Sequence, residues 1–402
     1  MSPRSPMSRW SRRPQLARAL AHGGLAGLAL AAAACGEDEH LLPTVDAQTS
    51  IDAPPSLDGP APARPTAIVV TGDYNVTGVF STVDVASRAV TANALAGVAG
   101  GEPWIRRIGD ELFIVNRASG NNVTIVRRSP LTFVDQFGTG AGSNPQDVAV
   151  VGDKLYVPVF DAQGGLRVID RRTRAMITID LDVDPDGAPN CISAHAVGDR
   201  VFVACDLFDP GFVPRGPGKI VVIDATTDTV ATSFDLANAN PFGRFVRTPE
   251  SSMFGGDLLI PTVPSLTSYT SGCLERVSVG ATPAANGCAV TNAALAGYVA
   301  AADVAPEGDR LWLAAFALQP DFSNDFGQLR SVDLATGALG AAVSGSTQLV
   351  GSVAACPGGH VVVGDITFGA AGVRIYKDGS EETTAALDVG RPVNGPNGIV
   401  CD

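Results

Sequence analysis

Short runs of apolar residues separated by turn-forming residues make up most of the chain from residue 66 onward. Runs such as "ELFIVN" (residues 111–116) and "RVFVAC" (200–205) each follow a Gly-Asp pair. Gly-Asp between two such runs is a hairpin signal, and the apolar spacing of an amphipathic helix is nearly absent. The pattern therefore predicts an antiparallel all-β protein.

A sequence pattern in which a turn beginning with Gly is followed by an apolar strand recurs along the chain, which indicates an internal repeat. It begins at Gly109, Gly152, Gly198, Gly256, Gly308 and Gly358. Each phrase has one short strand ahead of it and two strands behind it, such as "KIVVID" (219–224) and "TVATSFDL" (229–236). A repeat of this period that contains four antiparallel strands predicts one blade of a β-propeller.

The two ends of the repeat region predict how the ring closes. A seventh unit at the front (66–95) lacks its first strand, and the C-terminal "GPNGIVCD" (395–402) resembles the first strand of the other units. We therefore predict a seven-bladed β-propeller of four-stranded antiparallel blades over residues 66–402. A C-terminal strand would complete the first blade, so that no sheet edge stays open.

The N-terminal segment, residues 1–34, has the composition of an export signal. Five arginines lie between Arg4 and Arg18, an apolar stretch spans 20–34, and the first acidic residue is Glu37. This stretch is too short to span a bilayer, so residues 1–34 are predicted to be a secretory signal peptide. "SRRPQL" (11–16) resembles a twin-arginine signal except at Gln15, so both that export route and the general secretory route stay open.

Residues 28–35, "LALAAAAC", resemble a bacterial lipobox, with Ala32 where Leu is usual. The resemblance implies that Cys35 is lipid-modified and is the first residue of the mature chain; an ordinary cleavage site with an incidental Cys is the alternative. The acidic, Pro/Ala-rich residues that follow are predicted to be a flexible tether, which together with Cys35 makes up residues 35–65. Such a protein would be held in the cell envelope by its lipid anchor only, facing the periplasm or the exterior.

Charge and cysteines narrow the partners and the compartment. The whole chain has a net charge of −13, and residues 35–402 keep 41 acidic and 23 basic residues. A surface with so much negative charge disfavours nucleic acid. In an oxidising compartment six cysteines are expected to pair, although free buried thiols are the alternative. Neighbouring positions favour the pairs Cys191–Cys205, Cys273–Cys288 and, across the ring closure, Cys356–Cys401.

The repeats resemble a known family. "LYVPVFDAQGGLRVIDRRTRAMITIDL" (155–181) and "GKIVVIDATTDTVATSFDL" (218–236) resemble YVTN-type β-propeller repeats, and "LFIVN" (112–116) keeps the family's Asn. The resemblance covers about residues 66–402 and implies the propeller fold. It implies little about activity, because one fold hosts many functions.

Polar residues near the starts of the innermost strands are the first candidate site. We expect Glu102, Asp147, Asn190, Asp303 and Asn397 to converge on the propeller axis, with Arg106 and Arg244 as anion contacts. "EPW" (102–104) and "PNGI" (396–399) resemble parts of gluconolactonase (regucalcin-like) propellers. That resemblance implies that Glu102, Asp303 and Asn397 hold a divalent cation which polarises a lactone carbonyl. Turn and strand-cap roles are the alternative.

A second candidate is the segment "DVDPDGAPN" (182–190), which resembles the start of a calcium loop. Its oxygen ligands would come from Asp182, Asp184, Asp186 and Asn190. An EF-hand would have Glu at the twelfth position, where this chain has Ser193. A solvated acidic loop between the third and fourth blades is the alternative, and bound calcium would have a structural role.

Catalytic motifs are few, so no catalysis is assigned. His195 is expected in a strand beside a turn, and neither an HExxH array nor a G-x-S-x-G elbow occurs. The sequence therefore favours a monomeric binding or scaffold module with a protein or glycan partner. The loops 206–218 and 317–328 are the candidate contacts. A metal-dependent lactonase or related hydrolase is the alternative.

Overall fold

The structure is a computed structural model that describes residues 65–402 except 266–269, 319–323, 344–349, 368 and 394. The predicted signal peptide, Cys35 and the tether up to residue 64 lie outside the described residues. Within the described part, no helix has the length and apolar character needed to cross a membrane.

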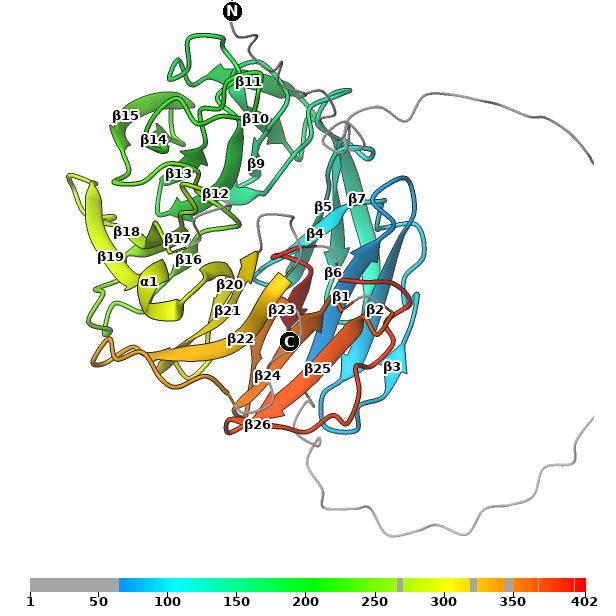
Figure 1. The fold of residues 1–402 in the computed structure, drawn as a ribbon. Coiled ribbons are helices and arrows are strands. Elements are labelled where there is room, and N and C mark those ends of the chain that lie inside the picture. Colours follow the sequence, from blue (N-terminus) through cyan, green and yellow to red (C-terminus); the bar gives the residue numbers. More distant parts are fainter. Residues whose placement is uncertain (1–64, 266–269, 319–323, 344–349, 368, 394) are drawn as a thin grey trace, which may run out of the picture. The chain divides into compact units, whose positions relative to one another are not determined.

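Seven antiparallel sheets follow one another along the described residues and surround a common axis as the blades of a propeller (Figure 1). The first blade contains, in order, β27 (Ile399–Cys401), β1 (Thr66–Gly72), β2 (Gly78–Asp84) and β3 (Val90–Thr91). The second contains β4 (Pro103–Ile108), β5 (Glu111–Asn116), β6 (Asn122–Arg127) and β7 (Thr132–Gly138). The third contains β8 (Ala149–Val151), β9 (Lys154–Pro158), β10 (Gly165–Asp170) and β11 (Met176–Asp180).

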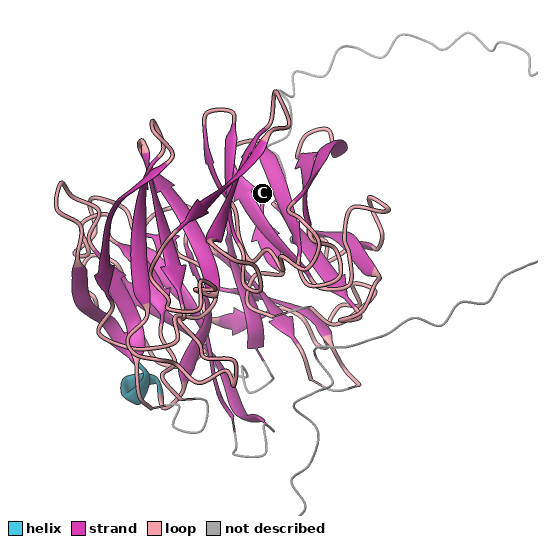
Figure 2. Cartoon of the chain, turned by 90° about the horizontal axis from the view of Figure 1, so that it is seen from above, coloured by secondary structure: helices cyan, strands magenta, loops and turns pink. Residues whose placement is uncertain are grey.

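Three of the other four blades repeat this order, and the sixth has three strands among the described residues. The fourth contains β12 (Cys191–Val197), β13 (Arg200–Cys205), β14 (Lys219–Asp224) and β15 (Thr229–Asp235). The fifth contains β16 (Val246–Arg247), β17 (Leu258–Pro261), β18 (Cys273–Val277) and β19 (Ala285–Thr291). The sixth contains β20 (Tyr298–Val304), β21 (Arg310–Leu318) and β22 (Asn324–Asp333), and the seventh β23 (Val350–Cys356), β24 (His360–Asp365), β25 (Gly372–Lys377) and β26 (Ser380–Glu381). The described residues contain one short helix, α1 (Asn292–Leu295), which follows β19 (Figure 2).

The C-terminal strand closes the ring, as the sequence predicts. β27 pairs antiparallel with β1, with Ala67 opposite Cys401 and Val69 opposite Ile399. The Gly-Asp hairpins at Gly109, Gly152 and Gly198 are confirmed as well, whereas at Gly256 the longer segment 248–257 connects the paired strands. Gly109, for example, has a φ of 58° in the two-residue turn between β4 and β5, a conformation that glycine adopts without steric cost.

Two innermost strands are shorter than the sequence predicts. Only Ala149–Val151 of the third blade and Val246–Arg247 of the fifth form strands. Pro145 and Pro241 each follow an Asn with positive φ and form only isolated bridges, with Val159 and Thr262, so the ladder is interrupted between these prolines and the strands β8 and β16. A second correction concerns the predicted loop 317–328. Its ends belong to β21 and β22, and residues 319–323 lie outside the described part.

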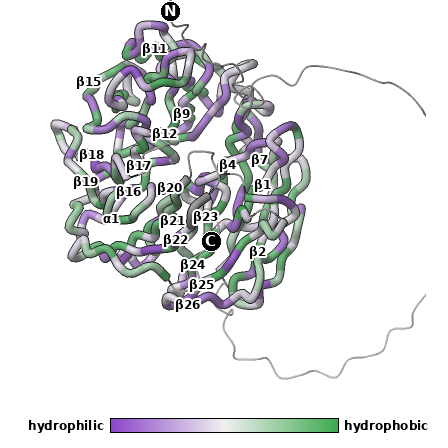
Figure 3. The backbone as a smooth tube through the Cα atoms, viewed as in Figure 1, coloured by the Kyte–Doolittle hydropathy of each residue, from purple (hydrophilic) through white to green (hydrophobic). Residues whose placement is uncertain are grey.

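Apolar side chains fill the spaces between neighbouring blades. One cluster joins Tyr156 and Leu166 of the third blade to Val203 and Val221 of the fourth. Figure 3 colours the chain by hydropathy and shows hydrophobic positions along the strands. Outer strands such as β11 and β15 are mostly exposed, because they cover the rim and have no further strand outside them. Burial of both sheet faces thus explains the continuous apolar runs in the inner strands.

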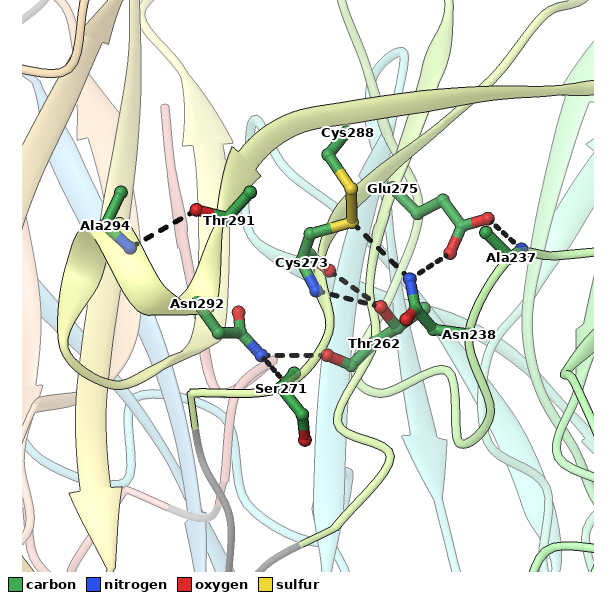
Figure 4. Close-up of a disulfide and its surroundings, with 10 residues drawn as sticks. All are labelled: Ala237, Asn238, Thr262, Ser271, Cys273, Glu275, Cys288, Thr291, Asn292 and Ala294. Atoms are coloured by element: carbon green, nitrogen blue, oxygen red, sulfur yellow. Dashed lines mark hydrogen bonds between the residues drawn. A yellow bond between two sulfur atoms is a disulfide. The ribbon is translucent and has the colours of Figure 1, made fainter.

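All three predicted disulfides are present: Cys191–Cys205, Cys273–Cys288 and Cys356–Cys401. The last joins β23 to β27 and therefore links the seventh blade to the strand that closes the ring. Figure 4 shows Cys273–Cys288, which joins β18 to β19. Beside it the buried carboxylate of Glu275 accepts hydrogen bonds from the backbone N–H of Ala237 and from Asn238 Nδ2 at 3.0 Å.

Candidate functional site

The polar residues of the innermost strands connect one blade to the next. Each accepts a hydrogen bond from a backbone N–H of the following blade: Asp147 from Ala194 (3.1 Å), Ser193 from Phe245 (2.8 Å), Asp303 from Ala355 (2.9 Å) and Ser352 from Gly398 (3.1 Å). These bonds satisfy amides that face the axis, which have no strand partner on that side. Asp147 and Asp303, two of the predicted site residues, therefore hold the ring together.

Arg106 and Asp147 form a buried two-pronged ion pair. Arg106 Nε lies 2.7 Å from Asp147 Oδ1, and Nη2 lies 2.6 Å from Oδ2. Ser193 Oγ donates to the same carboxylate at 2.8 Å, so Asp147 has its acceptor positions filled. Arg106, expected as an anion contact, is thus engaged by the second and third blades themselves.

Arg244 crosses between blades that are far apart in the sequence. Its Nη1 donates to the backbone carbonyl of Ile105 at 2.9 Å, which joins the fifth blade to the second. Burial, followed by the charge of Arg106, lowers the pKa of Arg244, while burial raises the pKa of Asp303. His195 lies in β12 as predicted, and burial together with Arg106 lowers its pKa to about 3, so that it is neutral at physiological pH.

A cavity of about 330 Å³ opens at the end of the blades where the innermost strands begin. In an antiparallel blade the loop before the first strand lies beside the loop after the second, and both kinds of loop form its walls. We call it the mouth cavity. Its aromatic lining consists of Tyr74, Trp104, Phe160, Phe208 and Phe242, and its charged lining of Glu102, Arg117 and Asp206. Gln146, Ile192 and the segments 240–243 and 395–396 complete it.

Three polar atoms of this lining, Trp104 Nε1, Arg117 Nε and Asp206 Oδ1, are buried and have no partner among the described residues. Asp206 is only 2% exposed, yet its Oδ1 accepts no hydrogen bond, and burial raises its pKa well above the usual range. The indole Nε1–H of Trp104 is likewise buried without an acceptor. Buried polar groups nearly always have partners, which ordered water or a bound ligand would supply here.

Glu102 and Arg117, the other charged residues of the mouth cavity, neutralise each other. Arg117 Nη1 lies 2.8 Å from Glu102 Oε1, and its guanidinium stacks over the Trp104 ring at 4.0 Å from the ring centroid. Burial lowers the pKa of Arg117, while the Glu102 carboxylate opposes that shift. Glu102 and Arg117 therefore add no net charge to the cavity.

Rigid supports hold the cavity wall formed by the third and fourth blades. Asn190 Nδ2 donates to the carbonyl of Phe160 at 3.0 Å, and its Oδ1 accepts from the N–H of Phe208 at 3.1 Å. The Cys191–Cys205 bridge fixes the two strands directly beside Asn190 and Asp206. Asn190, predicted as a calcium ligand, thus positions two of the aromatic walls.

The proposed lactonase-type ligands are engaged separately. Glu102 pairs with Arg117, Asp303 accepts from the N–H of Ala355, and the carbonyl of Asn397 accepts from the N–H of Ile105 at 2.8 Å. Of the three, only Glu102 lines the mouth cavity. The described residues contain no group of three or more His, Cys, Asp or Glu placed to hold a metal ion. Metal binding by these residues stays a prediction.

The candidate calcium loop lies between β11 and β12, between the third and fourth blades as expected. A guanidinium occupies its carboxylates: Arg215 pairs with Asp184, and its Nη2 lies 2.8 Å from Asp186 Oδ2. Asp182 has a φ of 47° and a backbone N–H bonded to Asp180. Calcium binding here also stays a prediction, and it would require displacement of Arg215.

Sequence reasoning missed Asp206 as a site residue and treated its loop only as a contact surface. The available signal was an acidic residue directly after an apolar strand and a half-cystine, in "VFVACDLF" (201–208). Phe208 and Phe212 of this loop pack with Phe160 at ring-centroid distances of 6.2 and 6.5 Å, so the loop is folded back onto the third blade.

No protein-family model matches the chain, and no curated protein matches it. Among solved structures, the Cps50 (Swd1) β-propeller domain of Myceliophteria thermophila is similar with a TM-score of 0.55 and 12% identity, over 77% of this chain and 92% of that chain. AztD of Citrobacter koseri has a TM-score of 0.49 and 11% identity, over 84% and 97% of the two chains. At such identities the first similarity shows the fold, a β-propeller, and nothing about activity.

Proposed function

We propose that this chain is a binding module of the cell envelope, without catalysis of its own, that takes its ligand in the mouth cavity. The carrying observation is the unpartnered carboxyl of Asp206 in a cavity walled by aromatic rings from five blades. The cavity has the size and the largely apolar character of a small-molecule site, and it also admits one side chain or sugar of a protein or glycan partner.

The module acts as a monomer displayed on the outside of a bacterial membrane or in the periplasm. The lipobox-like "LALAAAAC" and the acidic tether support a lipid anchor at Cys35. In this proposal Cys35→Ser moves the full-length protein from the membrane fraction to the soluble fraction. A protein that stays in the membrane fraction after this change contradicts the lipid anchor.

The binding function is tested by a thermal-shift screen of small molecules on the full-length chain, beside an assay of lactone hydrolysis with added calcium, zinc or manganese. We expect stabilising ligands whose effect is lost in Tyr74→Ala, and no hydrolysis. Hydrolysis that disappears in Glu102→Ala would favour the metal-dependent alternative. The pairing of Glu102 with Arg117 supports the binding function over that alternative.

A further inference from the structure

The charge balance of the mouth cavity defines the ligand that fits it. Its titratable lining groups are Tyr74, Glu102, Arg117 and Asp206. Glu102 and Arg117 neutralise each other at 2.8 Å, and a tyrosine is neutral at physiological pH. The ionised Asp206 would therefore leave one net negative charge in an apolar cavity, and such a charge is stable only when it is paired.

The walls around this carboxyl have the chemistry that suits a cation with an apolar body. Tyr74, Phe160, Phe208 and Phe242 surround the cavity, and aromatic faces attract ammonium groups by cation–π interaction. The Arg117 guanidinium already stacks over the remaining ring, Trp104, so one cation–π contact exists in the cavity wall.

The net negative charge of the chain also favours a cationic ligand. Residues 35–402 carry 41 acidic and 23 basic residues, and a protein of this net charge concentrates cations near its surface.

We propose, building on the binding function above, that the mouth cavity binds the ammonium group of an organic amine with an apolar body, and that the carboxylate of Asp206 is the counter-ion. Such an ammonium comes either from a free amine or from a lysine side chain of a protein partner. Both sources present an N–H donor to the Asp206 carboxylate, which lines the cavity, and an apolar stem to the rings.

The test compares probes of one shape and different charge on the full-length chain by isothermal titration calorimetry. The probes are phenethylamine, its neutral isostere phenethyl alcohol and the anion phenylacetate, with Nα-acetyl-lysine methylamide for the lysine source. We expect one amine per chain to bind about tenfold or more tightly than the alcohol, and no binding of the anion. Preference for phenethylamine indicates a free amine, whereas preference for the lysine derivative indicates a protein side chain.

Two pairs of variants locate the effect. Asp206→Asn is isosteric and is expected to remove the preference for the amine over the alcohol. Asp110→Asn, which changes a carboxylate with a 90% exposed side chain in the turn between β4 and β5, should leave binding unchanged. Tyr74→Ala alters a rim residue that is 58% exposed and should weaken the amine severalfold. Phe133→Ala, at a 50% exposed aromatic of the outer strand β7, is its control.

Three results overturn the ammonium assignment: equal affinity for the amine and the alcohol, amine binding that survives Asp206→Asn, or no saturable binding of either amine at millimolar concentration. If the alcohol binds as well as the amine and Tyr74→Ala weakens both, the cavity is still a ligand site. In that case the proposed function stands and only the ligand class is wrong.

Discussion

At the scale of single residues, burial decides which charged groups are structural and which are available to a ligand. Asp147 has a buried Arg106 and three further donors, whereas Asp206 is just as buried and its Oδ1 has no partner among the described residues. Both are aspartates beside a short apolar run, which follows Asp147 and precedes Asp206, so their residue type does not distinguish them. The difference lies in the neighbouring blade, which supplies donors to one carboxylate and aromatic rings to the other.

The Asp206 carboxyl should make stability depend on pH. Burial raises its pKa, so the folded chain keeps this proton at pH values where the unfolded chain has released it. The free energy of unfolding therefore falls as pH rises from about 4 towards the raised pKa, by up to about 1.4 kcal/mol per pH unit. Urea denaturation over a pH series should show a smaller fall in Asp206→Asn. Parallel curves for the two proteins would contradict an unpaired buried carboxyl.

The Arg106–Asp147 pair, in which the buried carboxylate has a charge partner, leads to a prediction about loss of that partner. Removing the arginine leaves a buried carboxylate without its charge partner, so Arg106→Met should lower the free energy of unfolding by about 3–5 kcal/mol. Arg174→Met is the matched control, because Arg174 pairs with Asp135 at the surface and has a 56% exposed side chain. That pair should contribute about 0–1 kcal/mol, as measured by the same denaturation. Equal losses in both variants would refute the structural role of the inner pair.

At the scale of elements, interrupted inner strands create the cavity that regular strands would fill. β16 is two residues long; ahead of it Pro241 forms only an isolated bridge with Thr262, and the segment 240–243 forms part of the cavity wall. Glu275 holds the preceding loop through Ala237 and Asn238, so this irregular segment has a fixed start. Asn190 has the same function for the loops that contain Phe160 and Phe208.

Removal of the Asn190 side chain should loosen that wall. Asn190 has a φ of 53°, so Asn190→Gly deletes both hydrogen bonds without backbone strain. We expect a loss of about 1–3 kcal/mol in the free energy of unfolding and weaker binding of phenethylamine. The control is Asn93→Gly, since Asn93 has the same φ and an exposed side chain. An unchanged affinity in Asn190→Gly would show that the wall needs no such support.

The sequence was informative about the fold and much less so about the site, for a physical reason. Gly-Asp turns and apolar strands are local features, and their period counts the blades; even the pairing of β27 with β1 follows from the missing strand. The mouth cavity instead assembles side chains from Tyr74 to Pro396. Arg215 likewise reaches Asp184 from 31 positions away, a contact that the local calcium-loop pattern does not contain.

At the scale of the whole molecule, the structure is a ring, and a ring is stable only if its last blade is connected to its first. Three strands of the first blade come from the start of the described chain, and the fourth comes from its end. Local contacts join the other blades in sequence order, whereas this junction depends on segments from opposite ends of the described chain. Loss of that junction exposes two strand edges and the apolar cluster between the seventh and first blades.

The Cys356–Cys401 bridge should therefore contribute more than its chain-entropy effect. It closes a sequence separation of 45 residues, and Cys273–Cys288 one of 15, so loop entropy alone predicts about 4 and 3 kcal/mol. Paired Cys→Ser substitution at 273 and 288 should cost about that amount and keep a single cooperative transition. The same substitution at 356 and 401 should cost more and split the unfolding, because blades near the opening unfold before the rest. Calorimetry of the two double variants measures both quantities. A single transition of equal loss in both would show that the strand pairing of β27 holds the ring without help from the disulfide.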